Sequence, residues 1–192
     1  MSNNRKDEFS VTRARQFYID TNVLISQYKP KDIFYHESVC IVRALKQREV
    51  TGYTSPLTIL EMVSFVCRNF PLKKGENPED TRRIALSKIL NEIPSFQLQF
   101  ISPVGDYSLK FDDIAVRIPA VLGNALGLAT SGLRTLDLMH LSAAKYCKET
   151  NTELTGFVTG DDAFLLQKRY LSERIGISFL SPEEFVKLLG LV

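Results

Sequence analysis

The chain has 192 residues, 44% of them hydrophobic and 24% charged, a balance typical of one globular domain that leaves little room for a second. Its three cysteines are odd in number and far apart, which argues against a disulfide framework or a zinc site. The net charge is only +2, and neither a signal peptide nor an apolar run long enough to span a membrane is evident, so we expect a cytoplasmic protein with no membrane contact.

Strand and helix signals alternate along the chain. Ser55-Pro56 and Ser181-Pro182 each combine a hydroxyl N-cap with a proline at the first helical position. Strands are expected at residues 16–19, 50–54, 97–104, 157–159 and 177–180. Helices are expected at residues 23–28, 35–47, 55–69, 81–92, 106–128 with a kink or break at Pro119, 138–149, 162–171 and 182–189. The repeated strand-then-helix order predicts an α/β fold of three layers, α/β/α, around a mainly parallel sheet of about five strands.

Four acidic residues stand where a carboxylate is awkward for folding, because each borders or interrupts an apolar run. They are Asp20, Glu61, Asp137 and Asp161. Burying a lone carboxylate costs several kcal/mol unless a cation or hydrogen bonds compensate it. Because ligands of parallel α/β sheets bind beyond the carboxyl ends of the strands, we expect the four side chains to meet at one edge. An all-oxygen set of this kind favours one or two Mg²⁺ or Mn²⁺ ions over zinc.

Each of these carboxylates also has a purely structural alternative. Asp20 is compatible with an Asx turn and Asp161 with the N-cap of the following helix. Asp137 is compatible with a role at a helix dipole, and Glu61 with a buried pair to an arginine.

The charge left over on the remaining surface is basic. Removing the four carboxylates from the 22 acidic residues leaves 18 against 24 basic ones, which suits a phosphate-bearing substrate. The candidate substrate-binding residues are basic pairs, with ordinary solvated surface charge as the alternative. They are Lys73, Lys74, Arg82, Arg83, Lys168 and Arg169.

Each of the four carboxylates lies in a short sequence motif. These segments are FYIDTNVLI at 17–25, TSPLTILE at 54–61, LDLMHLSAA at 136–144 and VTGDDAF at 158–164. In this order they resemble the motifs of the PIN-domain nucleases, and among them most nearly the VapC-type toxins. One such motif is weak evidence, whereas four in order are fairly specific.

The resemblance implies a metal-dependent endoribonuclease that hydrolyses RNA phosphodiester bonds, most nearly the toxin of a VapBC-type toxin–antitoxin system. It implies Asp20, Glu61, Asp137 and Asp161 as catalytic and metal-binding residues, with Mg²⁺ or Mn²⁺ as the cofactor. Asp162 is a candidate for contact with the metal through water, and Thr21 and Thr159 are candidates for supporting hydrogen bonds. The implied partners are an RNA substrate, an antitoxin protein and a second copy of the chain.

Two alternatives share this fold: an RNA-processing nuclease that is not a toxin, and a non-catalytic module that binds RNA or protein. All four ligand positions are acidic, which disfavours the non-catalytic module.

The chain also departs from the small toxins. We expect an N-terminal extension over residues 1–15 and a single nuclease domain over 16–192, with insertions near 71–80 and 105–136. His140, one helical turn after Asp137, is expected to be packed or hydrogen-bonded in the interior.

Overall fold

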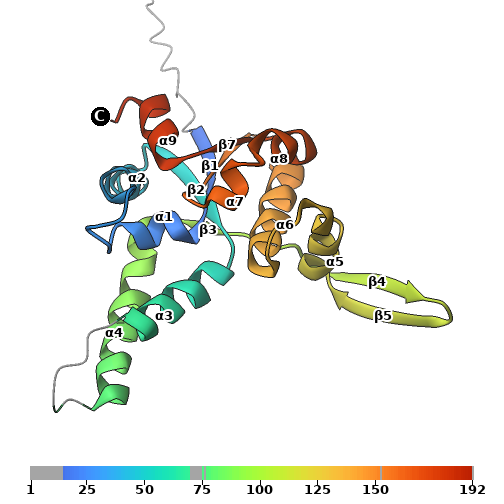
Figure 1. Ribbon diagram of the computed structural model, residues 1–192, viewed down its shortest axis with the longest axis horizontal. Coiled ribbons are helices and arrows are strands. Elements are labelled where there is room, and N and C mark those ends of the chain that lie inside the picture. The colour runs from blue at the N-terminus through green and yellow to red at the C-terminus, as the bar shows by residue number, and fades with distance from the viewer. Residues whose placement is uncertain (1–14, 70–74, 76, 152, 192) are drawn as a thin grey trace, which may run out of the picture.

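A five-stranded parallel sheet with the order β3-β2-β1-β6-β7 forms the centre of the computed structural model (Figure 1). The structure describes residues 15–69, 75, 77–151 and 153–191. The sheet strands are β1 (Arg15–Ile19), β2 (Val50–Thr54), β3 (Gln99–Phe100), β6 (Leu154–Val158) and β7 (Ser178–Leu180). The expected fold class is therefore confirmed. All but the last residue of the expected N-terminal extension, and also Lys73 and Lys74, lie outside the described residues.

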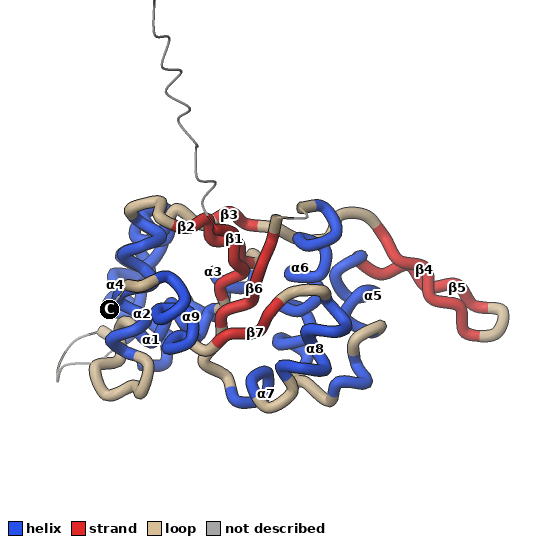
Figure 2. Tube along the Cα trace, turned by 90° about the horizontal axis from the view of Figure 1, so that it is seen from above, coloured by secondary structure: helices blue, strands red, loops and turns tan. Residues whose placement is uncertain are grey.

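The central strand β1 sends alternate side chains to two hydrophobic clusters, one on each face of the sheet. Phe17 and Ile19 belong to the first cluster and Tyr18 to the second. The first cluster gathers α1 (Thr21–Ser26), α2 (Tyr35–Lys46), α3 (Leu57–Asn69), α4 (Pro78–Glu92) and α9 (Pro182–Leu189). The second gathers α6 (Thr135–Thr150), α7 (Asp162–Leu165) and α8 (Lys168–Ile175). Figure 2 shows the strands lying between these two sets of helices.

The expectation of a helix over residues 106–119 is wrong. This segment is an antiparallel hairpin of β4 (Asp106–Phe111) and β5 (Ile114–Pro119), which projects from the body of the molecule in Figures 1 and 2. Polar and apolar residues alternate along β4, which is the period of a strand. Asp112 adopts a left-handed φ of 49° in the turn. Pro119 ends the hairpin, and α5 (Ala120–Leu126) and the short 3-10 helix η2 (Ala129–Ser131) follow it.

Further boundaries differ from expectation, since β6 and α6 each begin three residues before the strand and the helix expected from 157 and 138. The helix expected over residues 162–171 is divided into α7 and α8, because Gln167 has a non-helical backbone between them. The strand expected over 97–104 pairs only at Gln99–Phe100. The Ile101 N–H donates one last hydrogen bond to the Thr54 carbonyl, and Pro103 has no N–H to continue the strand pairing. The end of the expected loop, residues 78–80, forms the first turn of α4, where the Asn77 side chain accepts a bond from the Glu79 N–H.

The other helices follow their expected positions closely, and a 3-10 turn, η1 (Ile93–Phe96), joins α4 to β3. Ser181 and Glu184 form a capping box at the start of α9, as the Ser-Pro signal predicts. Within the described residues, no helix is both long and apolar enough to cross a membrane.

The contact between Tyr107 and Gly123 attaches the hairpin to α5 and generates a testable prediction. A Cβ atom at Gly123 would overlap Cβ and Cγ of Tyr107, so Gly123→Ala should force the hairpin away from α5. We expect a loss of about 1 kcal/mol in the free energy of unfolding and faster amide hydrogen exchange over residues 106–119. Urea unfolding and hydrogen-exchange mass spectrometry measure the two effects.

Gly127→Ala is the matched control, because a Cβ at Gly127 would meet only the Asn124 carbonyl, at 3.4 Å, and the backbone there is right-handed helical. This variant should leave hairpin exchange unchanged. Equal exchange in the Gly123 variant and the wild-type protein would contradict the assigned role of this contact.

Candidate functional site

One cavity of about 390 Å³ is lined by all four of the expected carboxylates. Asp20 follows β1 directly, and two residues separate Asp161 from the end of β6. Glu61 lies in the second turn of α3 and Asp137 in the first turn of α6. The rest of the lining falls into an apolar part and a polar part. The apolar part is Ile25, Leu57, Leu60 and Leu136, and the polar part is Thr21, Asn22, Ser64 and Arg68. The carboxyl edge of the parallel sheet therefore brings together side chains that are up to 141 residues apart in sequence.

Asp20 is the most deeply buried of the four, with 6% of its surface exposed. Its Oδ2 atom accepts hydrogen bonds from Asn22 Nδ2 and Thr159 Oγ1, both at 2.7 Å. Asn22 also accepts the Gly160 N–H through Oδ1, at 2.9 Å, which ties the loops after β1 and β6 together. Burial raises the pKa of Asp20, and the charge of His140 and the Thr159 hydrogen bond only partly offset this rise.

Glu61 is held by His140 rather than by an arginine. His140 Nε2 donates to Glu61 Oε2 at 2.8 Å, and in the neutral ring Tyr18 O–H donates to Nδ1 at 3.0 Å. Burial raises the pKa of Glu61, but the hydrogen bond and the charge of His140 and the nearby Thr21 hydroxyl outweigh it and leave the pKa lowered. Burial lowers the pKa of His140, yet Glu61 and the charges of Asp20 and Asp137 leave it raised. His140 is thus packed and hydrogen-bonded, as the sequence suggested, and it is 2% exposed.

Asp137 and Asp161 each use one oxygen at a helix start. Asp137 Oδ2 accepts the Arg134 N–H at 3.2 Å, and Asp161 Oδ1 accepts the Ala163 N–H at 2.7 Å. Both structural alternatives drawn from the sequence are therefore present, and both residues still line the cavity. Burial raises the pKa of Asp137, and the negative charge of Asp161 raises it further. These two carboxylates repel each other across the cavity.

A row of buried hydroxyl groups supports the floor of the site. Thr21 Oγ1 donates to Thr58 Oγ1 at 2.9 Å, Thr58 lies 2.6 Å from Thr54 Oγ1, and Thr54 donates to the Ile19 carbonyl at 2.9 Å. This chain links α1, α3, β2 and β1. Thr21 and Thr159 therefore sit where supporting residues were expected, Thr159 with a direct bond to Asp20 and Thr21 beside His140.

The donor chemistry of the cavity suits a hard divalent cation. Four carboxylates line it, and carboxylate oxygens are the ligands that such ions prefer in proteins. No group of three or more His, Cys, Asp and Glu side chains that could hold a metal ion occurs in the described part of the chain. The carboxylates line one cavity without converging on one point, which is the arrangement that mutual repulsion favours.

The remaining candidates lie elsewhere on the molecule. Asp162 is exposed and is not among the described residues that line the cavity. Arg83 pairs with Asp80, Lys168 with Glu184 and Arg169 with Glu173, and Arg82 is exposed on α4. Ser64 and Arg68 line the cavity but are not among the expected site residues, although they lie three and seven residues after Glu61, at the spacing of one helix face.

Comparison of the chain with models of known protein families found no matching family, and comparison with curated proteins found no significant match.

The raised pKa of Asp20 predicts that this carboxylate weakens the metal-free fold at neutral pH. A pKa that folding raises gives stability below the unfolded-state pKa, and this stability is lost as the pH rises through the folded-state pKa. Asp20→Asn keeps an acceptor for Thr159 and Asn22 but carries no charge. In EDTA at neutral pH, we expect its Tm to exceed that of the wild-type protein by about 2–4 °C, as measured by calorimetry.

The gain in Tm should shrink toward acidic pH, where the wild-type carboxyl is itself protonated. Asp162→Asn is the control, since this exposed side chain does not line the cavity and should leave the Tm unchanged. A lower Tm for Asp20→Asn at neutral pH would show that the charge of Asp20 stabilises the fold.

Proposed function

We propose that this protein is a metal-dependent endoribonuclease of the PIN-domain type, acting in the cytoplasm on RNA phosphodiester bonds. The observation that carries the proposal is the cavity lined by Asp20, Glu61, Asp137 and Asp161 at the carboxyl edge of a parallel sheet. The four sequence motifs around these residues support it independently of the fold.

The carboxylates would hold one or two Mg²⁺ or Mn²⁺ ions. When bound, such an ion lowers the pKa of a water molecule and neutralises charge on the phosphate oxygens. Asn22 and Thr159 fix the orientation of Asp20, and His140 fixes that of Glu61. His140 itself is too deeply buried to approach a substrate, with 2% of its surface exposed, so its role is to position Glu61. The chemistry then needs no nucleophile from the protein.

The cavity has the size and the mixed lining that one nucleotide requires. Its volume of about 390 Å³ lies in the range of small-ligand sites. Leu60 and Leu136, exposed to 66% and 47%, border the acidic end and offer an apolar surface to a base or a ribose. The narrower proposal of a toxin controlled by an antitoxin protein, with the chain acting as a homodimer, rests on the VapC-like motifs alone.

Cleavage of RNA tests the proposal directly. We expect the purified protein to cleave structured or single-stranded RNA internally with Mg²⁺ or Mn²⁺, and EDTA to stop the reaction. Asp20→Asn and Asp137→Asn should each reduce the rate by about 100-fold or more, because each removes a charged donor to the ion. Asp113→Asn, in the exposed hairpin turn, is the control and should retain full activity.

Cleavage that both substitutions leave unchanged, or that fails with every metal and RNA supplied, would contradict the proposal. Expression in a bacterial host separates the toxin from a processing enzyme. Growth arrest that Asp20→Asn abolishes supports a toxin, whereas normal growth with an active enzyme supports a processing nuclease.

A further inference from the structure

We infer that Arg68 forms a phosphate-binding subsite of the cavity, where it holds a backbone phosphate of single-stranded RNA beside the cleaved bond. The inference rests on the proposed function for its substrate class. It goes further by naming the residue that contacts the substrate, the group that is contacted and the strandedness of the RNA.

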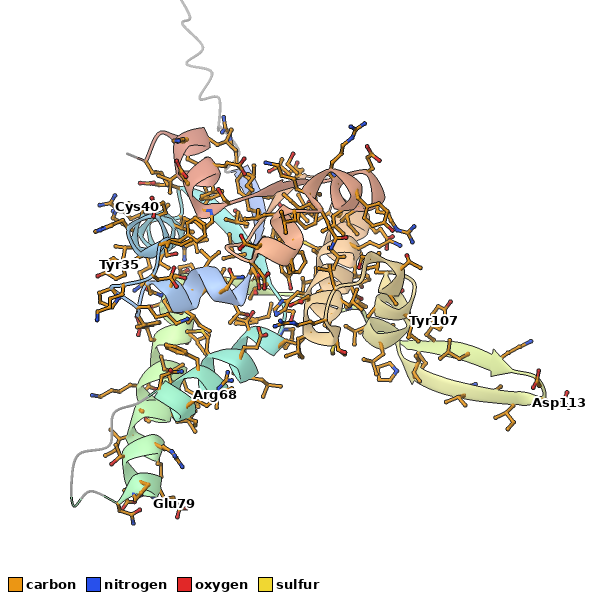
Figure 3. The ribbon with its side chains drawn as sticks, in the orientation of Figure 1. Tyr35, Cys40, Arg68, Glu79, Tyr107 and Asp113 are labelled. Atoms are coloured by element: carbon orange, nitrogen blue, oxygen red, sulfur yellow. The ribbon has the colours of Figure 1, made fainter. Side chains whose placement is uncertain are left out.

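Helical spacing puts Arg68 on the same wall as a catalytic carboxylate. Glu61, Ser64 and Arg68 are separated by three and four residues on α3, and all three line the cavity. Figure 3 marks Arg68 on this helix. Seven residues of helix separate the Cα atoms of Glu61 and Arg68 by about 10 Å, so Arg68 stands beyond the carboxylates rather than among them.

The Arg68 side chain is turned toward the carboxylates yet is not neutralised by them. Its Nε donates to the Ser64 carbonyl oxygen at 3.2 Å, which directs the guanidinium group back along the helix toward Glu61. Among the described residues Arg68 forms no ion pair. A guanidinium has five N–H donors and only one is engaged here, so the two Nη groups remain to bind a phosphate in a bidentate manner.

Other basic side chains of the described part are engaged elsewhere. Arg83, Lys168 and Arg169 form surface ion pairs, and Lys29 lies over the ring of Phe65, 5.1 Å from its centroid. Among the described residues that line the cavity, Arg68 is the one cation. An anionic chain that enters an acidic cavity needs such a charge, because the carboxylates repel every phosphate that a metal ion does not bind.

The apolar wall indicates a single strand. Leu57 and Leu60 lie on α3 beside Glu61, and Leu136 lies next to Asp137. The bases of a duplex are stacked and paired, so they cannot present a face to this wall, whereas an unstacked base can. A single strand can thus place a base against the leucines and its neighbouring phosphate on Arg68.

The experiment measures RNA binding separately from cleavage. A short fluorescein-labelled single-stranded RNA is titrated with protein that carries Asp20→Asn to prevent cleavage, at constant Mg²⁺ and several KCl concentrations. We expect Arg68→Gln to weaken binding about tenfold. The slope of log K against log [KCl] should become shallower by about 0.7, the value for one phosphate contact to a single strand. Arg43→Gln, at an exposed position on α2 that does not line the cavity, is the matched control and should leave the slope unchanged.

A second arm identifies the phosphate itself. RNAs with a single uncharged methylphosphonate linkage are tested at each position in turn. At one position, the uncharged linkage should weaken binding to the protein that keeps Arg68. At the same position it should not weaken binding to the Arg68→Gln variant any further.

Four outcomes overturn the subsite: an unchanged slope for Arg68→Gln, an equal change for Arg43→Gln, no phosphate position specific to Arg68, or no RNA binding. If the wild-type protein cleaves RNA while Arg68→Gln binds normally, the subsite fails and the proposed function stands. If Arg68 shows the expected slope and the wild-type protein cleaves nothing, the subsite stands and the nuclease fails.

Discussion

Burial of the Asp20 carboxylate at the end of the central strand is the constraint on which the rest of the site depends. A charge that is 6% exposed must be held by hydrogen bonds, and Asn22 and Thr159 supply them. Asn22 in turn accepts the Gly160 N–H, so the same network fixes the loop that carries Asp161. A side chain at Gly160 would press against the ring of Phe34, which explains why the smallest residue follows Thr159. One buried carboxylate thereby positions two strand ends.

Electrostatics gives this arrangement its chemical character. Asp20 and Asp137 both have raised pKa values, because burial and neighbouring carboxylates oppose their charge. The charge of His140 compensates for part of this charge at Asp20, and the charges of Arg134 and His140 do so at Asp137. The bond from His140 to Glu61 engages one side of its ring. The cavity therefore has a deficit of positive charge at its acidic end and a single arginine at its other end. A divalent ion with a phosphate-bearing substrate would satisfy both ends.

The sequence allowed the sheet and the four carboxylates to be predicted, because both follow from local rules. An apolar run that ends in Asp20 marks a strand end, and parallel strands bring such ends to one edge. The hairpin could not be told from a helix because its apolar residues also fit a helical spacing. Only the first strand alternates, with Leu109 between Ser108 and Lys110, and the second begins with three apolar residues.

Partners that are far apart in the sequence could not be predicted. The Tyr18–His140 hydrogen bond joins residues 122 positions apart, and no local pattern encodes it. Arg68 differs, because its helical spacing from Glu61 is visible in the sequence. An arginine on an exposed helix face nevertheless resembles ordinary surface charge until the structure shows that both residues line one cavity. Adjacent basic pairs such as Lys168-Arg169 attract attention in a sequence, yet neighbours on a helix point in different directions, and this pair binds two glutamates.

Direct measurement of Mn²⁺ binding tests the central claim, that the four carboxylates are a metal site. Electron paramagnetic resonance of free Mn²⁺ gives the bound fraction without requiring RNA or turnover. We expect one or two ions per wild-type chain and a large loss of affinity in Asp20→Asn, while Asp113→Asn binds like the wild-type protein. No bound Mn²⁺ in the wild-type protein, or equal binding in Asp20→Asn, would contradict a metal site at this sheet edge.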